Sequence, residues 1–322
     1  MVLNYFYKMS LRMAASTVFV ALALNGVVKA DDLSGDMVAK RLQVSEPTKI
    51  EVRDYRGRVV TLNSPAKRVV ALAPHIVENI FAAGGGDALV GAVDYCDFPE
   101  AAKAIPRVGK ISSASLEAIA AKNPDLVVVW ESAGAAKILS KLESLGLVVY
   151  VSDPKNLADV ARSIRDYGVL LGQAQVANRA ADEYLGRLAQ LRATYAERTS
   201  VTVLYQVWHE PLQTLNREHM ISDVIRLCGG RNAFGDAVTI APKISLEAVL
   251  QRDPEAIVAS GMGEARPDWL EHWRAWSSLT AVKNDNLYFI PPDIIQRHTP
   301  RILDGAAMMC EHLDDSRIKR AY

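Results

Sequence analysis

Histidine side chains are the first candidates for chemistry in this sequence, because imidazole serves as a metal ligand and as a general base. The six histidines are His75, His209, His219, His272, His298 and His312. They lack the close pairing typical of a zinc site, so we expect no dedicated metal site. Gly84-Gly85-Gly86 follows a predicted helix and precedes a predicted strand, which is typical of a helix end and not of a phosphate loop. Because no nucleophile elbow is present either, the sequence favours ligand binding over catalysis.

Aromatic side chains occupy more informative places, namely the ends of predicted strands. Tyr95 follows one strand, Trp130 ends another, and Trp208 closes the segment VTVLYQVW. In open α/β sheets ligands bind outside the carboxyl ends of strands, where aromatic rings offer a wide contact surface to a large flat ligand. Core packing is the alternative for each ring taken alone. The three tryptophans of WLEHWRAW have helical spacing, and we expect them in the core or on a lobe surface.

Strands and helices alternate in both halves of the chain. A predicted hairpin, KIEVRDYRGRVVTLN, precedes the strand RVVALAP, the helix HIVENIFAAGGG, the strand ALVGAV, the helix SLEAIAAKN and the strand DLVVVW. The alternation resumes in the second half with segments such as VTVLYQV, MISDVIRLCGG and EAIVAS. Such alternation is typical of parallel βαβ units. The predicted fold class is therefore α/β, with two lobes of mainly parallel sheets flanked by helices and joined by one long helix.

The domain boundaries follow from a segment without strand signals. Residues 156–198 carry an apolar stripe at helical spacing, which predicts a helical connector, broken by glycine into a short and a long helix. Residues 31–155 then form an N-terminal lobe and residues 199–322 a C-terminal lobe. SLEAIAAKNPDLVVV from Ser115 resembles SLEAVLQRDPEAIVA from Ser245, which indicates that the two lobes share an architecture.

The amino terminus has the pattern of a secretory signal peptide. Lys8 and Arg12 precede an apolar stretch over residues 13–28, and Val28-Lys29-Ala30 ends it with small residues. A transmembrane anchor needs about 20 apolar residues, and Asn25 interrupts this stretch. We therefore predict that residues 1–30 are removed and that a free periplasmic protein begins at Asp31.

The charges and cysteines agree with an exported binding protein. Basic and acidic residues number 37 each, so nothing indicates a nucleic acid or an anionic membrane as partner, and we expect a monomer. Disulfides persist in an oxidising compartment, and three cysteines leave one unpaired. Cys228 and Cys310 are the expected pair, because both lie in helical stretches of the second half while Cys96 stands alone in the first. Three reduced, buried thiols are the alternative.

Five segments together resemble the periplasmic cobalamin-binding protein family. They are RVVALAPHIVENIFAAGGGDALVGAVDYCDFP, SLEAIAAKNPDLVVVW, HMISDVIRLCGGRNAFGD, APKISLEAVLQRDPEAIV and RHTPRILDGA, and the likeness spans Val59 to Leu313. The family belongs to the helical-backbone class of ABC importer binding proteins, shared with ferric siderophore and haem receptors. The resemblance implies that the protein is not an enzyme, needs no cofactor, and delivers a corrinoid, taken up between two lobes, to an inner-membrane ABC permease.

The resemblance also implies roles for single residues. Glu117 and Glu247 match the carboxylates that dock each lobe onto permease arginines; favouring a helix dipole is the alternative role. Cys228 and Cys310 match the family's disulfide. The positions expected to face the ligand are Tyr95, Trp130, Trp208, Arg297 and Arg301. The alternative role for one of the two arginines is to brace a helix start.

The sequence departs from the family's pattern in two places. GKISSAS lacks the tryptophan of the pattern, and Ala241 stands where another aromatic residue is expected. His75, His209 and His298 lie near the expected cleft, so a different cobamide or an iron-bearing macrocycle with a protein ligand to its metal remains open. A ferric siderophore or haem receptor is therefore the alternative within the class, and a metal-dependent enzyme is the alternative outside it.

Overall fold

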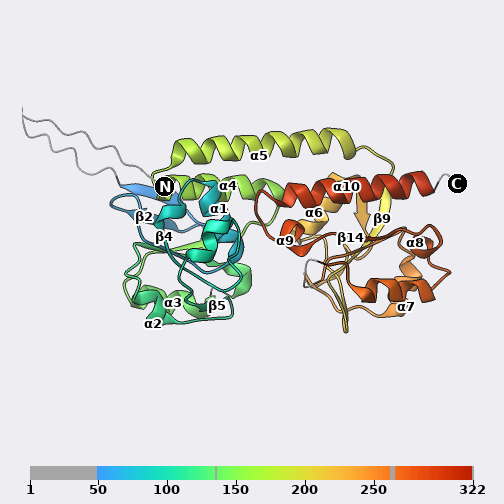
Figure 1. The fold of residues 1–322 in the computed structure, drawn as a ribbon, viewed down its shortest axis with the longest axis horizontal. Helices are drawn as coiled ribbons and strands as arrows, with labels where there is room; N and C mark the ends of the chain where they lie inside the picture. Colours follow the sequence, from blue (N-terminus) through green and yellow to red (C-terminus); the bar gives the residue numbers. More distant parts are fainter. Residues whose placement is uncertain (1–48, 135, 262–264, 321–322) are drawn as a thin grey trace, which may run out of the picture. The chain divides into compact units, whose positions relative to one another are not determined.

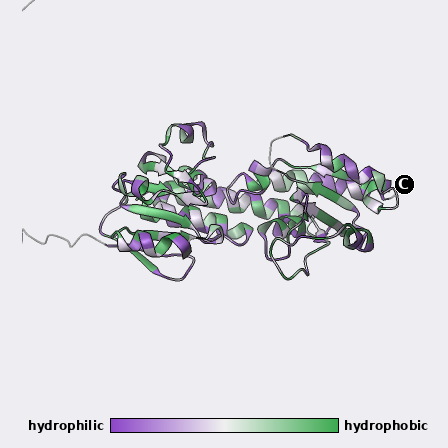
Figure 2. Ribbon diagram, turned by 90° about the horizontal axis from the view of Figure 1, so that it is seen from below, coloured by the Kyte–Doolittle hydropathy of each residue, from purple (hydrophilic) through white to green (hydrophobic). Residues whose placement is uncertain are grey.

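The computed structural model describes residues 49–134, 136–261 and 265–320, which lie in one compact unit, Pro47–Tyr322. The predicted signal peptide, residues 1–30, lies outside the described residues. Two mainly parallel sheets flanked by helices form two lobes, so the predicted fold class is confirmed (Figure 1). Figure 2 shows that the strands are mostly hydrophobic while the helices carry both hydrophobic and hydrophilic residues.

The first lobe is built on a parallel sheet of order β4-β3-β7-β8. Its strands are β3 (Val69–Ala71), β4 (Leu89–Ala92), β7 (Leu126–Trp130) and β8 (Val149–Ser152). The helices of this lobe are α1 (Pro74–Ala82), α2 (Leu116–Ala120) and α3 (Ala136–Ser144), with short 3-10 helices η2 (Gly86–Ala88), η3 (Glu100–Ala104) and η4 (Glu131–Ala133). Strands buried on both faces read as continuous apolar runs, which is why β3 and β7 were recognisable in the sequence.

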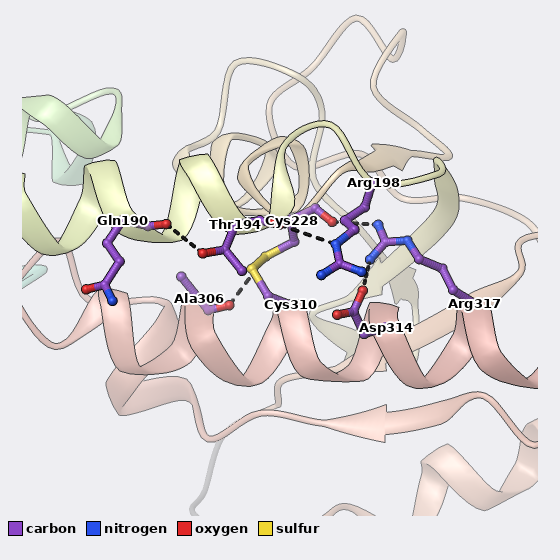
Figure 3. Close-up of a disulfide and its surroundings, with 8 residues drawn as sticks. All are labelled: Gln190, Thr194, Arg198, Cys228, Ala306, Cys310, Asp314 and Arg317. Carbon is purple, nitrogen blue, oxygen red and sulfur yellow. Dashed lines mark hydrogen bonds and ion pairs between the residues drawn. A yellow bond between two sulfur atoms is a disulfide. The ribbon is translucent and has the colours of Figure 1, made fainter.

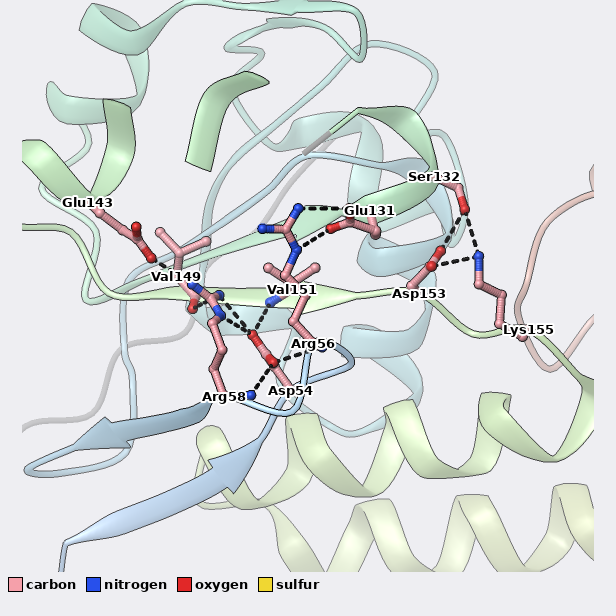
Figure 4. A network of polar contacts seen from close by, with 10 residues as sticks. All are labelled: Asp54, Arg56, Arg58, Glu131, Ser132, Glu143, Val149, Val151, Asp153 and Lys155. Carbon is pink, nitrogen blue, oxygen red and sulfur yellow. Dashed lines mark hydrogen bonds and ion pairs between the residues drawn. The ribbon is translucent and has the colours of Figure 1, made fainter. Parts of the chain in front are cut away.

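A hairpin of β1 (Ile50–Arg53) and β2 (Val59–Leu62) precedes this sheet, as predicted. Asp54 fixes its turn: the buried carboxylate accepts bonds from the backbone N–H groups of Arg56 and Arg58 at 2.9 Å and from the Arg58 guanidinium (Figure 4). The backbone N–H of Tyr55 donates to the carbonyl of Val151 in β8 at 3.0 Å. Because the turn is bonded to the outer strand, the hairpin is held against the first lobe.

Two helices, α4 (Leu157–Leu170) and α5 (Ala174–Tyr195), occupy the predicted connector segment. Asn156 and Asp159 form a capping box at the start of α4. Gly172 lies between the helices and has a φ of 68°. This left-handed backbone conformation suits glycine, because it is strained in a residue that carries a side chain. The other two glycines of the segment, Gly168 and Gly186, lie inside α4 and α5 and break neither helix. Helix α5 packs against α4 along one part of its length and against α6 and α10 of the second lobe along the other (Figure 1).

The second lobe is built on a parallel sheet of order β12-β9-β13-β14. Its strands are β9 (Val201–Gln206), β12 (Gly230–Asn232), β13 (Ala256–Ala259) and β14 (Leu287–Phe289). The helices of this lobe are α6 (Met220–Leu227), α7 (Leu246–Arg252), η5 (Asp268–Ala275), α8 (Thr280–Lys283), α9 (Pro292–Ile295) and α10 (Ile302–Lys319). Small hairpins extend both lobes: β5 (Gly109–Lys110) with β6 (Ser113–Ala114), and β10 (Trp208–His209) with β11 (Leu212–Gln213).

A disulfide joins Cys228, at the end of α6, to Cys310 in α10, which confirms the predicted pair (Figure 3). Both cysteines are fully buried. Arg317 of α10 donates to the carbonyl of Cys228 at 2.7 Å, so the same helix pair is also tied by a polar contact. Cys96 is a buried free thiol, and burial raises its pKa to about 12. No helix within the described ranges is long and apolar enough to cross a membrane.

Candidate functional site

Each lobe has a pocket at the carboxyl ends of its sheet, where α/β proteins bind ligands. The first-lobe pocket has a volume of about 300 Å³ and lies where β3 and β7 end. Its floor is Leu72, Val129 and Trp130, and the β5–β6 hairpin and α3 supply its sides. The remaining lining residues are Ile111, Ser112, Ser113, Ala114, Leu116, Ala133, Gly134, Lys137, Ile138 and Lys141.

The second-lobe pocket has a volume of about 410 Å³ and is rich in aromatic rings. The side chain of Gln206, the last residue of β9, accepts a hydrogen bond from the buried Trp273 Nε1 at 2.7 Å. The ring of Trp269 lies over Gly261, beyond the end of β13: a Cβ on Gly261 would come within 3.0 Å of it. His209 stacks on Trp269 with ring centroids 5.5 Å apart. The remaining lining residues are Glu210, Leu212, Leu246, His272 and Trp276.

The aromatic residues predicted to face the ligand lie at strand ends, but in different settings. Tyr95 is 77% exposed and adopts a φ of 63°, which is uncommon outside glycine. Trp130 is half-buried and lines the first-lobe pocket. Trp208 is half-buried, and its Nε1 donates to the carbonyl of Glu210 at 2.9 Å. Tyr95 is therefore open to solvent, whereas Trp130 and Trp208 are both half-buried.

Sequence reasoning missed two tryptophans that line the second-lobe pocket. Of the three in WLEHWRAW, Trp273 is 6% exposed and belongs to the core, as expected. Trp269 and Trp276 line the pocket beside His272. The signal was present in their spacing of four and three residues, which places rings on one face. Spacing does not say what that face meets, and the segment forms a 3-10 helix instead of the α-helix for which this spacing was interpreted.

Two buried histidines, His75 and His298, and the half-buried His219 converge near Trp130. The ring of His75, at the start of α1, lies 4.9 Å from that of Trp130 and 5.5 Å from that of His298. His219, which caps α6 through its Nδ1, lies 6.0 Å from His298. His75 Nε2, His298 Nδ1 and Trp130 Nε1 have no hydrogen-bond partner among the described residues. Since buried polar atoms are normally paired, this cluster has unused hydrogen-bonding capacity.

Burial keeps the three imidazoles neutral. Desolvation lowers the pKa of His75 to about 3, with a further contribution from Arg297. It lowers the pKa of His219 to about 4, helped by Lys155, and holds the pKa of His298 well below its usual range. Neutral imidazole is the form that binds metal or accepts a hydrogen bond. Among the described residues, however, no group of three or more His, Cys, Asp or Glu side chains is arranged to hold a metal ion.

Arg297 and Arg301 both bind the buried carboxylate of Glu78 in α1. Arg297 donates to Glu78 at 2.9 Å and to Asp97 at 2.8 Å, and it also pairs with Asp293. These carboxylates raise the pKa of Arg297 despite its partial burial. The two predicted ligand-binding arginines are thus engaged by carboxylates, two of which, Glu78 and Asp97, belong to the first lobe.

Glu117 and Glu247 occupy equivalent positions in the two lobes. Each lies in the first turn of a short helix, α2 or α7. The serine before each helix, Ser115 or Ser245, caps it, because its side chain accepts a hydrogen bond from the backbone N–H three residues later. Both carboxylates are exposed, and neither forms a salt bridge with a described residue. Backbone and Ser245 hydrogen bonds lower the pKa of Glu247. The helices lie on the side of their lobes away from α5 (Figure 1).

Two α/β lobes that are bridged by α5, each with a pocket at the carboxyl ends of its sheet, define a two-lobed ligand-binding protein. The family model described as periplasmic binding protein matches residues 69–294, and the chain belongs to this family. The family consists of substrate-binding proteins. The resemblance found in the motifs is therefore confirmed.

Individual relatives show which members of the family this chain resembles. The vitamin B12-binding protein of Vibrio cholerae is 36% identical over 250 residues, which cover 77% of this chain and 90% of the relative. The crystal structure of the periplasmic vitamin B12 binding protein BtuF of Vibrio cholerae matches with a TM-score of 0.73 at 34% identity, covering 79% of this chain and 98% of that one. A periplasmic heme binding protein from Pseudomonas aeruginosa matches with a TM-score of 0.66 at 25% identity, covering 76% and 91%.

Proposed function

We propose that this protein captures cobalamin or a related corrinoid in the periplasm and delivers it to an inner-membrane ABC permease. The observation that carries the proposal is the 36% identity with a vitamin B12-binding protein over nearly the whole length of that relative. The two pockets at the strand ends support it, because Trp130 lines the first, several tryptophans line the second, and a corrinoid is a large, flat ligand that buries much apolar surface.

Calorimetric titration with cyanocobalamin tests this proposal directly. We expect binding at micromolar protein concentration, and Trp130→Ala should weaken it, because the ring forms part of the floor of the first-lobe pocket. The absence of binding, together with tight binding of haem or of a ferric siderophore, would refute the corrinoid proposal and leave the class of protein intact.

Haem or a ferric siderophore is the second candidate ligand. It is favoured by the unpaired nitrogens of His75 and His298 and by exposed His209, because imidazole nitrogen can coordinate iron. The likeness to a heme binding protein agrees with it. The visible absorption spectrum of the purified protein distinguishes these candidates, since haem and corrinoids absorb at different wavelengths.

For permease docking we propose Glu117 and Glu247. Both are exposed, both occupy the first turn of a helix, and together they provide one carboxylate per lobe for a two-sided transporter. Reversing both charges should leave cobalamin affinity unchanged and abolish uptake in cells. Glu143→Lys on α3, another exposed carboxylate, is the control. Unchanged uptake in the double variant would refute the assignment.

Export and the division into lobes complete the proposal. Removal of residues 1–30 predicts a periplasmic protein whose first residue is Asp31, which amino-terminal sequencing checks. We further propose lobes at residues 31–155 and 199–322, a connector at 156–198, and a monomer that carries out no catalysis. Since a helix such as α5 bends less readily than crossing strands, the lobes should move little on binding.

A further inference from the structure

A basic pocket lies at the β12 edge of the second sheet, and none of its lining residues belongs to the two pockets at the carboxyl ends of the sheets. Its volume is about 510 Å³. Four arginines from different segments converge on it: Arg217 precedes α6, Arg226 lies in α6, Arg231 lies in β12, and Arg252 ends α7. The remaining lining residues are Ser222, Gly230, Asn232, Ala233, Gly235 and Asp236. We call this site the arginine pocket.

Hydrogen bonds hold the guanidinium groups of the arginine pocket in place. Arg252 donates to the Asp236 carboxylate at 2.6 and 3.1 Å and lies 4.5 Å above the ring of Phe234. Arg217 Nε donates to the carbonyl of Gly235 at 2.8 Å. Arg231 donates to the Thr202 hydroxyl, also at 2.8 Å. Because each guanidinium has five N–H donors, these contacts fix the groups and leave donors available to a ligand.

The arginine pocket carries more positive than negative charge. Asp236 pairs with Arg252, and Asp223, just behind the pocket, pairs with Arg226. Within the described ranges, Arg217 and Arg231 form no salt bridge. Two exposed arginines of the pocket therefore have no carboxylate partner, and neighbouring like charges repel one another unless an anion binds between them.

We propose that the arginine pocket binds a small phosphate-bearing anion. Guanidinium forks match phosphate oxygens in bidentate geometry, and a phosphate group offers three acceptor oxygens with nearly two charges. Several arginines that converge from different elements suit such a multi-oxygen group better than a single carboxylate. A soluble phosphate compound and the phosphate of a lipid headgroup present the same chemistry, and the experiments below distinguish the two sources.

Calorimetric titration of the mature protein with inorganic pyrophosphate tests the soluble source. We expect binding that weakens as salt is added, because the contacts are ionic. The double variant Arg217→Gln/Arg231→Gln should lower the affinity about tenfold or more, since hydrogen bonds to charged groups are lost. Arg179→Gln/Arg192→Gln, two exposed positions on α5, is the control with the same change of net charge. Cobalamin affinity should be the same in all three proteins.

Sedimentation with vesicles tests the lipid source. Phosphatidylglycerol vesicles should retain the wild-type protein and release the Arg217→Gln/Arg231→Gln variant, with phosphatidylcholine vesicles as the blank. Arg217→Lys/Arg231→Lys keeps the charge but removes the forks, and should also weaken binding. The proposal is overturned if neither pyrophosphate nor phosphatidylglycerol binds, or if the α5 control variant loses binding as much as the pocket variant.

Discussion

Glu78 and Arg301, which are 223 residues apart in the sequence, form a two-pronged ion pair. Arg301 Nε donates to one carboxylate oxygen at 2.9 Å and Nη2 to the other at 2.8 Å. Its guanidinium also lies 3.9 Å above the ring of Phe98. The Glu78 side chain is 3% exposed and the Arg301 side chain 19%. The pair therefore links α1 of the first lobe to the start of α10 in the second.

Replacing Glu78 with Gln should destabilise the protein strongly. Glu78 is the carboxylate shared by Arg297 and Arg301. Without it Arg297 keeps Asp97 and Asp293, but the largely buried Arg301 loses its carboxylate partner. We expect a loss of about 3–5 kcal/mol in the free energy of unfolding, measured by urea denaturation. Glu131→Gln breaks the more exposed pair with Arg56 and should cost about 1 kcal/mol or less. Equal losses in the two variants would contradict the structural role of Glu78.

Acid should destabilise the protein through the buried histidines His75 and His298 and the half-buried His219. Their pKa values in the fold are lowered, to about 3 for His75 and about 4 for His219, below the ordinary value near 6.5. A group whose pKa is lowered in the fold stays neutral there while the unfolded chain takes up a proton. The stability it contributes is complete above about pH 6.5 and is lost as the pH falls towards 4, at about 1.4 kcal/mol per pH unit for each histidine.

Urea denaturation between pH 7 and pH 5 measures this loss. The His219→Gln variant should lose less stability over that interval than the wild type, because one group that takes up a proton on unfolding is gone. His209→Gln, at an exposed position, is the control and should follow the wild type. If His219→Gln and wild-type protein have the same pH dependence, the histidines do not cause the acid sensitivity.

The two parallel sheets could be predicted from sequence because local patterns determine them. β3 and β7 are short apolar runs between turn residues, and Ser115 and Ser245 mark helix starts by capping. The connector was predicted for the same reason, and Gly172 marks its break. Boundaries of this kind depend on residues that are close together in the sequence, so they can be predicted without knowledge of the fold.

The contacts among distant side chains could not be predicted in the same way. Arg297 and Arg301 were expected to face the ligand, yet Glu78, which binds both, has no distinguishing pattern inside HIVENIFAAGGG. The convergence of His75 with His298 depends on how the lobes meet, and no spacing encodes it. The arginine pocket was missed because its four arginines come from four separate segments.

Reduction of the Cys228–Cys310 disulfide should lower stability without changing the fold class. The bond spans 82 residues, and closing a loop of this size restricts the unfolded chain by about 4 kcal/mol. Thermal unfolding with and without dithiothreitol should show a lower melting temperature in the reduced protein. The Cys228→Ala/Cys310→Ala variant should be insensitive to dithiothreitol. A shift that persists in this variant would assign the effect to another cause.

Trp273 and Trp276, only three residues apart, should respond differently to replacement by alanine. Trp273 is buried and donates to Gln206, so Trp273→Ala should cost about 3–5 kcal/mol of unfolding free energy through a lost hydrogen bond and a new cavity. Trp276 is 38% exposed at the second-lobe pocket, so Trp276→Ala should change stability by less than about 1 kcal/mol.

If this pocket contacts the corrinoid, Trp276→Ala should weaken cobalamin binding by about tenfold, as expected for one lost aromatic contact of 1–1.5 kcal/mol. Trp276→Phe keeps a ring and should recover most of the affinity. Unchanged affinity in Trp276→Ala, with wild-type protein that binds cobalamin, would place the ligand elsewhere in the second lobe.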